Sequence, residues 1–408
     1  MKAAFIHTDL RLYWPGRLKA FRTLARAKQW ELGVVELSGK GSPYAFAQRN
    51  SDDFGEDWRC LFQDRGPEAI APCEARRAVC DCLDAMNPDA VVACGGVAYY
   101  SGAAALYWGR RKGRPVVLLD NARLADVPRG RVTTWIKRRL YANASAMMIP
   151  APAYQTDYLH WGFREEQLFY GLNVVDNADW AAKAESARAQ GLESLRKERG
   201  LPDRFFLGVG RQIEKKNWIG AIKAFSDLSG HKVTGEWGLA LVGDGPERSR
   251  LEEYSRESGV KNVRFLPFAE PSELAQYYAL ADCLVLPSFG ETWGLVVNEA
   301  MACGCPVLIS KQCGCASTLV KEGENGWTFD ATSPQELAQR MVTMASLSDD
   351  GRRRMGEASR RIIADWGLDR FCQGLLAAIE YALRCPRLRP GLIDRALLRL
   401  WKGRYRPV

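Results

Sequence analysis

Two glutamates, Glu291 and Glu299, stand eight positions apart in the segment PSFGETWGLVVNEAMACGCP, which runs from Pro287 to Pro306. The first belongs to a polar loop that contains glycine, and the second to an apolar run that suits a short helix ending at Gly304. The start of such a helix offers unpaired backbone N–H groups and the positive end of the helix dipole, which together attract an anion. The spacing therefore predicts an anion site beside a carboxylate.

Gly294 allows a ligand to come close to the backbone at the helix start, because glycine has no side chain. Glu299 lies among apolar residues, and a buried carboxylate needs a partner. A nucleotide diphosphate sugar would provide one, since Glu299 lies about 9 Å along the axis from the helix start, within reach of a ribose diol. Glu291 would then meet the sugar. The alternative is one surface glutamate and one that pairs with a core arginine or lysine.

A second candidate loop lies within the segment FFLGVGRQIEKKN, residues 205–217, which begins as an apolar strand and turns at Gly210. Arg211 and Lys216 lie in this loop, before the next helix. Loops at strand ends form the ligand crevice of an open α/β sheet. A forked guanidinium and a point-charge ammonium suit a diphosphate leaving group. The alternative for both residues is ordinary solvated surface charge.

Further strands are expected within residues 239–254, 262–268 and 281–288, each ending in a loop that would line the same crevice. Phe268, at the end of the second, would either flank a nucleobase or pack in the core.

The order GR…EKKN, VGDGP, LPF, PSFGETWGLVVNEAMACGCPV and GENGWTF strongly resembles the donor-binding half of family-four retaining glycosyltransferases of the GT-B fold, over residues 204–345. The most specific element is the pair of glutamates separated by seven residues. The resemblance implies an α/β protein with two Rossmann-like, doubly wound domains that face each other across a cleft. It also implies a role in bacterial polysaccharide or lipopolysaccharide assembly.

The resemblance assigns the phosphate contacts of the donor. Arg211 and Lys216 are expected to hold the diphosphate, while Gly294 and Leu295 offer backbone amides to it. One departure from the family pattern is Asn217, where many relatives carry glycine, and we expect no harm to the chemistry from it.

The implied activity is retaining transfer of a hexosyl group from a UDP-, GDP- or ADP-sugar to a hydroxyl of a glycan acceptor, which we expect to be lipid-linked. Glu291 contacts the donor sugar and Glu299 holds the ribose by this resemblance. Cations stabilise the leaving diphosphate, so neither a metal nor another cofactor is expected. The alternatives are a nucleotide-sugar epimerase or hydrolase, which acts on the donor alone, and a noncatalytic nucleotide-sugar-binding subunit.

With 408 residues the chain is long enough for two α/β domains. Strands and helices also alternate in its first half, which predicts a second doubly wound unit. We expect an N-terminal acceptor-binding domain over 1–180, a linker over 181–202, a nucleotide-sugar-binding domain over 203–366, and C-terminal helices over 367–408 that pack back on the N-terminal domain.

The first half offers less specific candidates. Many relatives place a histidine after the strand PVVLLD, but this chain has Asp120 there, which would orient the donor sugar, take the acceptor's proton or cap a turn. His7 ends the first strand and would face the crevice or pack as a neutral imidazole. Gly16 would approach the phosphates, and Arg17 would meet an acidic acceptor.

Charge and hydropathy bear on membrane contact. The net charge is +9, from 57 basic and 48 acidic residues. Residues 129–141 and 392–407 mix arginine and lysine with Trp, Leu and Ile at helical spacing. Such stretches either lie on an anionic membrane surface or form ordinary solvated helix faces. Nucleic acid is not expected, since no nucleic-acid motif accompanies the charge.

Residues 90–108 form an uncharged run about long enough to cross a bilayer. Gly95 and Gly96 divide it, so we expect a short strand and an Ala-rich helix instead. The first residues suit a strand rather than a signal peptide. We therefore expect a cytoplasmic protein, either free or peripheral on the inner face of the cytoplasmic membrane.

The twelve cysteines and three histidines do not form a metal-binding pattern, since no CxxC pair occurs. No metal ligand is therefore proposed, and a reducing compartment argues against disulfides.

Overall fold

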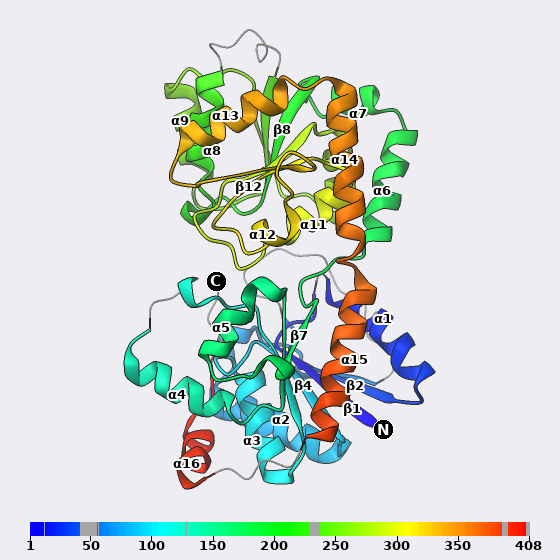
Figure 1. Cartoon of the computed structure of the whole chain (residues 1–408), viewed down its shortest axis with the longest axis vertical. Helices are drawn as coiled ribbons and strands as arrows, with labels where there is room; N and C mark the ends of the chain where they lie inside the picture. The colour runs from blue at the N-terminus through cyan, green and yellow to red at the C-terminus, as the bar shows by residue number, and fades with distance from the viewer. Residues whose placement is uncertain are drawn as a thin grey trace. The chain divides into compact units, whose positions relative to one another are not determined.

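The structure is a computed structural model of the chain. It describes residues 1–11, 13–40, 55, 57–126, 129–228, 237–385 and 391–404. These residues form two compact units (Figure 1). The N-terminal unit comprises Met1–Val174 and Leu368–Val408, and the C-terminal unit comprises Val175–Gly367.

One parallel sheet forms the centre of the N-terminal unit. Its described strands are β1 (Lys2–His7), β2 (Glu31–Ser38), β3 (Trp58–Phe62), β4 (Ala90–Cys94), β5 (Val116–Leu119), β6 (Ala146–Ile149) and β7 (Leu168–Tyr170). Their order in the sheet is β3-β2-β1-β4-β5-β6-β7. Because the chain builds outward from β1 on one side and from β4 on the other, the strand order reverses between these two strands. Ligands bind at this point in doubly wound folds, beyond the carboxyl ends of the strands.

Helices cover the sheet of the N-terminal unit. They are α1 (Trp14–Ala27), α2 (Pro72–Met86), α3 (Tyr100–Lys112), α4 (Arg131–Tyr141), α5 (Gln155–His160), α15 (Leu368–Arg384) and α16 (Leu392–Leu400), with 3-10 turns at η2 (Pro67–Ala69), η3 (Leu124–Asp126), η4 (Pro152–Tyr154) and η5 (Glu165–Gln167). Helix α15, from the last part of the sequence, packs against α1 and against β4 to β7. Its Phe371 and Leu375 share one core with Leu18 and Phe21 of α1.

The C-terminal unit repeats this plan. Its described strands are β8 (Arg204–Val209), β9 (Trp237–Val242), β10 (Val263–Leu266), β11 (Cys283–Leu286), β12 (Val307–Ser310) and β13 (Gly326–Phe329), in the order β10-β9-β8-β11-β12-β13. All neighbours pair in parallel. Strands β9, β11 and β12 are buried along their whole length, which is why they are continuous apolar runs. Here the order reverses between β8 and β11, so the loops after these two strands flank the expected ligand position.

The helices of the C-terminal unit are α6 (Asn177–Ala189), α7 (Leu192–Glu198), α8 (Trp218–Asp227), α9 (Arg248–Glu257), α10 (Pro271–Leu280), α11 (Leu295–Ala302), α12 (Ala316–Leu319), α13 (Pro334–Ala345) and α14 (Asp349–Ala364), with a 3-10 turn at η6 (Glu214–Lys216). The two units are thus both Rossmann-like and doubly wound, which confirms the expected fold class.

The unit boundaries differ from the sequence expectation at the linker. Residues 181–202 lie mainly in α6 and α7, and α6 packs against α10 and α11. Trp180, Ala184 and Ala187 are the buried residues of α6, and this charged stretch belongs to the C-terminal unit. The last helices, α15 and α16, belong to the N-terminal unit.

The uncharged run at 90–108 is divided as expected. It forms β4 and the first part of α3, with Gly95 at φ +92° and Gly96 at φ +57° between them. These left-handed conformations suit glycine, which has no Cβ to clash. Within the described ranges, no helix has the length and apolar character that crossing a membrane requires.

Candidate functional site

The loop after β8 carries the two predicted cations. It turns at Gly210 and closes with η6, so that Lys216 ends a single 3-10 turn. Gly243, after β9, must be glycine, because a Cβ there would lie 2.3 Å from the carbonyl oxygen of Gly210. Arg211 has an exposed side chain, and its carbonyl accepts a hydrogen bond from the indole of Trp218 at 2.9 Å. Backbone contacts therefore fix this loop.

Asn217 joins this loop to two others. It adopts φ +55°, a left-handed conformation that asparagine tolerates better than most residues, and its side chain caps α8 by accepting from the Gly220 N–H at 3.2 Å. Its amide donates to the carbonyl oxygens of Pro287 at 3.2 Å and Ala331 at 2.9 Å. The departure from the family's glycine thus adds three hydrogen bonds that hold the loops after β8, β11 and β13 together.

Lys216 and Glu291 meet directly. The Lys216 ammonium donates a hydrogen bond to the Glu291 carboxylate, and their side chains are only 16% and 20% exposed. The backbone N–H of Phe289 donates to the carbonyl of Lys215 at 2.9 Å, which ties the two loops at a second point. The structure therefore brings together a predicted phosphate ligand and a predicted sugar ligand at the reversal point of the sheet.

The loop that carries Glu291 is also fixed from its other side. The Glu291 carbonyl accepts from the N–H of Gly314 at 2.9 Å, and the Trp293 carbonyl accepts from the N–H of Cys315 at 3.1 Å. Gly294 has φ +100°, and a Cβ there would lie 3.0 Å from Leu286. Both the backbone conformation and the limited space therefore require glycine.

Helix α11 begins at Leu295, with Gly294 as its N-cap. No side chain caps it, so the amides at its start remain available to a ligand, as anion binding requires. Glu299 is 2% exposed, which confirms that its carboxylate is buried. The hydroxyl of Tyr278 on α10 donates to it at 2.7 Å. The Tyr278 hydroxyl is therefore one partner of the buried carboxylate.

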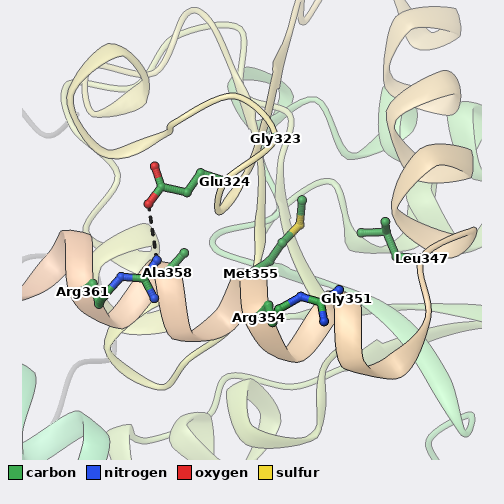
Figure 2. A pocket seen from close by; sticks show the side chains of 8 residues that line it. All are labelled: Gly323, Glu324, Leu347, Gly351, Arg354, Met355, Ala358 and Arg361. Carbon is green, nitrogen blue, oxygen red and sulfur yellow. Dashed lines mark hydrogen bonds and ion pairs between the residues drawn. The ribbon is translucent and has the colours of Figure 1, made fainter.

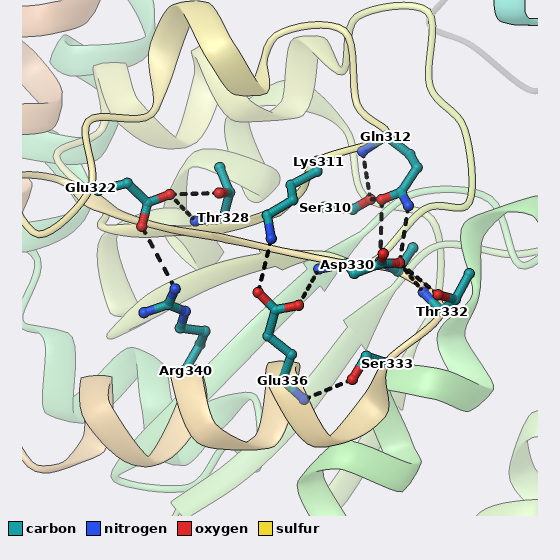
Figure 3. A network of polar contacts seen from close by, with 11 residues as sticks. Ser310, Lys311, Gln312, Glu322, Thr328, Asp330, Thr332, Ser333, Glu336 and Arg340 are labelled. Atoms are coloured by element: carbon teal, nitrogen blue, oxygen red, sulfur yellow. Dashed lines mark hydrogen bonds and ion pairs between the residues drawn. The ribbon is translucent and has the colours of Figure 1, made fainter.

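Sequence reasoning missed Tyr278 and a polar network behind the site. Ser310, at the end of β12, donates to the carbonyl of Ser288 at 2.8 Å. Its hydroxyl also lies 2.7 Å from the side-chain oxygen of Gln312 (Figure 3). The side-chain amide of Gln312 donates to the Asp330 carboxylate at 3.1 Å. The side-chain oxygen of Gln312 accepts from the backbone N–H of Ala331 at 3.2 Å. These contacts hold the loops after β11, β12 and β13 in register. Polar residues directly after buried strands are the sequence signal that could have indicated them.

Phe268 does not pack in the core, because 38% of it is exposed. Its backbone N–H donates to Asp244 at 2.9 Å. Phe289, in the loop after β11, is 48% exposed. Each aromatic ring therefore offers surface at the strand-end edge of the C-terminal unit.

In the N-terminal unit, Asp120 follows β5 and makes local contacts. One carboxylate oxygen accepts from the Tyr141 hydroxyl at 2.9 Å, and the other from the Ala122 N–H at 3.2 Å. Burial raises the pKa of Asp120, and the hydrogen bond from Tyr141 opposes that rise. A Cβ on Gly96 would lie 2.3 Å from the carboxylate, so Asp120 packs closely against the loop after β4. These are the contacts of a turn-capping residue.

Arg17 is not free to meet an acceptor, so that expectation is wrong. The side chain is buried in α1, its guanidinium donates to the Val174 carbonyl at 2.6 Å, and it lies over the Trp14 ring at 4.9 Å. Burial lowers the pKa of Arg17 to about 10. Gly16, in the first turn of α1, faces open space, since a Cβ there would meet nothing within 4 Å.

His7 is a neutral, packed imidazole, in agreement with the second of the two interpretations. Its Nδ1 accepts a hydrogen bond from the Asp9 N–H at 2.9 Å, and its ring centroid lies 4.7 Å from that of Trp14. Burial and the nearby charge of Arg17 lower the pKa of His7 to about 3.

A pocket of about 370 Å³ lies elsewhere in the C-terminal unit, against α14 (Figure 2). Arg361 and Glu324 form an ion pair of 3.5 Å beside it. Its lining comes from α14 and neighbouring turns, without the loops after β8 and β11, and therefore does not belong to the candidate site. Among the residues that the structure describes, no group of three or more His, Cys, Asp or Glu side chains could hold a metal ion.

Comparison with solved structures defines the class of fold. The lipopolysaccharide outer core galactosyltransferase WaaB superposes with a TM-score of 0.67 and 15% identity, over 93% of this chain and 99% of that one. The Anabaena protein HepE, in complex with UDP and glucose, superposes with a TM-score of 0.67 and 20% identity, over 92% and 98% of the two chains. With its two Rossmann-like units, the protein has the GT-B fold.

Sequence comparison finds a family match in the C-terminal unit. Residues 193–362 match the family model described as Glycosyl transferases group 1. A D-inositol 3-phosphate glycosyltransferase of Corynebacterium glutamicum (strain R) is 29% identical over 240 residues, which are 57% of this chain and 56% of that protein. A second, from Corynebacterium jeikeium (strain K411), is 33% identical over 40% of this chain and 41% of its own length. The matched stretches thus span about half the length of these curated relatives.

Proposed function

We propose that the protein is a retaining glycosyltransferase of the hexosyltransferase type, which moves a sugar from a nucleotide diphosphate sugar to a hydroxyl of a glycan acceptor. The observation that carries this proposal is the meeting of Lys216 with Glu291 at the reversal point of the second sheet, beside the uncapped start of α11. A cation, a carboxylate and free backbone amides are the groups that a sugar diphosphate requires. The match of residues 193–362 to the model of Glycosyl transferases group 1 supports the same class of reaction.

In this proposal the donor replaces an internal ion pair. The diphosphate binds Lys216 and Arg211 and the amides of Gly294 and Leu295, and Glu291 turns from the ammonium to the hydroxyls of the donor sugar. Bond cleavage adds one negative charge to the phosphate that carried the sugar, and preorganised cations stabilise that charge in the transition state. These groups already supply the positive charge, so the proposed reaction needs no metal ion or other cofactor.

The remaining predicted residues take supporting roles. Glu299 binds the ribose hydroxyls, and the hydrogen bond from Tyr278 orients its carboxylate. Gly16 gives the phosphates access at the start of α1, where a side chain would stand in open space. Asp120 caps the turn after β5, so that a leaving phosphate oxygen rather than this carboxylate takes the acceptor's proton.

The donor and acceptor classes are also proposals. A UDP-sugar is the first donor to test, because HepE binds UDP and glucose in its crystals. A lipid-linked glycan of polysaccharide or lipopolysaccharide assembly is the proposed acceptor, and the likeness to WaaB favours it. The protein would then act in the cytoplasm, at the inner face of the cytoplasmic membrane.

The test of this function is a transfer assay with purified protein, radiolabelled UDP-, GDP- and ADP-sugars and a membrane extract, without and then with magnesium. We expect label in the lipid fraction with one nucleotide family and no requirement for magnesium. Label that appears only as free sugar would identify a hydrolase, and label that appears as an isomeric nucleotide sugar would identify an epimerase. Nucleotide binding without turnover of any donor would indicate a binding subunit.

A further inference from the structure

Most of the exposed large hydrophobic side chains in the described chain lie on two neighbouring helices. Of eight such residues, five belong to α4 and α16 of the N-terminal unit: Val132 at 72% exposure, Trp135 at 50%, Leu392 at 83%, Ile393 at 53% and Leu400 at 76%. Single exposed apolar residues are common on soluble proteins, whereas a group on adjacent elements marks an interaction surface.

Helix α16 carries apolar residues on its exposed side as well as on its buried side. Leu398 is buried against the rest of the unit. Leu392, Ala396 and Leu400, spaced four residues apart, form a stripe on the exposed side, together with Ile393. Residues at this spacing lie on one face of a helix. The exposed leucines are therefore a coherent apolar face.

Specific contacts hold α16 in this orientation. Asp394 forms an ion pair of 2.8 Å with Arg139 of α4. The Arg76 guanidinium donates to the Arg399 carbonyl at 2.7 Å, and the indole of Trp401 donates to the Val97 carbonyl at 2.6 Å. These contacts anchor the inner side and both ends of the helix while the leucine stripe remains exposed.

The charges around the stripe have one sign. Every charged residue of α4 is basic, and Arg131 and Arg138 are exposed. Arg395 and Arg399 border the stripe on α16 and are also exposed. The acidic residue of these two helices is Asp394, which Arg139 neutralises. The surface is therefore apolar at its centre and cationic at its border.

We propose that α4 and α16 form a docking face for an anionic lipid bilayer. Exposed Leu, Ile and Trp side chains insert into the boundary between headgroups and acyl chains, while arginines bind the lipid phosphates. Charge complementarity favours an anionic bilayer over a second copy of this chain, because two copies would bring arginine against arginine. The inference rests on the proposed function for its purpose, which is to bring the enzyme to a lipid-linked acceptor, but lipid binding itself needs neither donor nor acceptor.

The test is flotation of the full-length protein with vesicles of phosphatidylcholine alone and of phosphatidylcholine with phosphatidylglycerol. We expect binding to the anionic vesicles, weakened about tenfold or more in the double variant Leu392→Gln/Leu400→Gln. We expect Arg395→Gln/Arg399→Gln to weaken it about 25-fold, since each basic residue near an anionic surface contributes about fivefold. Leu383→Gln, a leucine of α15 with 38% exposure, and Arg353→Gln/Arg354→Gln on α14 are the matched controls, and both should bind as the wild type does.

Equal binding to the two kinds of vesicle would overturn the proposal, as would unchanged binding by the α16 variants. A wild-type dimer that Leu392→Gln/Leu400→Gln converts to a monomer would assign the face to a second copy and also overturn it. A thermal-shift measurement of the wild type with UDP, made without vesicles, reports separately on the C-terminal unit. Absence of a shift together with binding to anionic vesicles would count against the proposed function and leave the docking face supported.

Discussion

The Lys216 ammonium and the Glu291 carboxylate neutralise each other across the loops that follow β8 and β11. Both side chains are mostly buried, so solvent screens this ion pair less than it screens a pair on the surface. The pair links the two loops directly. A donor diphosphate would offer Lys216 two charges in place of one. The pair therefore preorganises the phosphate site without filling it.

Removal of the Lys216 charge tests its role at the leaving group. We expect Lys216→Ala to lower kcat/KM about 100-fold, because one preorganised group contributes about 3 kcal/mol to transition-state stabilisation. Lys215→Ala is the matched control, since Lys215 is the exposed neighbour with the same charge. Steady-state kinetics with the identified donor decide the matter, and equal effects of the two substitutions would exclude a specific role.

Glu291→Gln should separate nucleotide binding from transfer. The variant keeps the shape of the side chain but frees Lys216 from a competing charge, so we expect UDP to bind a few fold more tightly. Transfer should fall about 100-fold, since the sugar loses its charged partner. Calorimetry with UDP and single-turnover transfer assays measure the two quantities. Weaker UDP binding would show that the carboxylate orients the ammonium for the phosphates rather than competing with them.

Tyr278→Phe should destabilise the C-terminal unit. The substitution leaves the Glu299 carboxylate buried without its 2.7 Å hydrogen bond, which costs about 1–3 kcal/mol. A fall in Tm of several degrees is the expected result. Tyr254→Phe, on the surface helix α9, is the control and should leave Tm unchanged. A Tm for Tyr278→Phe equal to that of the wild type would mean that water or another group satisfies Glu299.

Asn217 offers a test of loop coupling. Asn217→Gly retains the left-handed conformation but removes three hydrogen bonds, and Asn217→Ala also strains the backbone. We expect losses in unfolding free energy of about 1–2 kcal/mol for the glycine variant and about 1 kcal/mol more for alanine. Chemical denaturation measures both. Identical stability of the two variants would contradict the strain argument.

Acid should destabilise the N-terminal unit through His7. Its pKa is lowered from 6.5 to about 3 in the folded protein, so the unfolded chain binds a proton that the folded protein excludes. The contribution of His7 to the free energy of unfolding is therefore fully present above about pH 6.5, and it is lost progressively as the pH falls towards 3. Between pH 7 and 5 we expect an excess loss of about 1–2 kcal/mol in the wild type over His7→Gln. Parallel pH profiles of the two proteins would contradict this assignment.

Local patterns in the sequence were sufficient for β8 to β11, the loops after them and the short helix that contains Glu299, but not for the short strands β3, β7, β12 and β13. The partner of Glu299 could not be predicted, because Tyr278 comes from another helix and its hydroxyl is unremarkable within the apolar run AQYYAL. Arg17 looked solvent-exposed by residue type, but α15 covers α1 from the far end of the sequence and buries the guanidinium. Contacts between distant segments account for both differences.

The central claim is that the C-terminal unit binds a nucleoside diphosphate through Arg211, Lys216 and the start of α11. The most direct measurement is isothermal titration of the wild type, Arg211→Ala/Lys216→Ala and Lys215→Ala with UDP, GDP and ADP in the absence of metal. The account predicts that one nucleotide binds the wild type and Lys215→Ala equally, and binds the double variant at least about 100-fold more weakly. Equal affinity for the wild type and the double variant would contradict it.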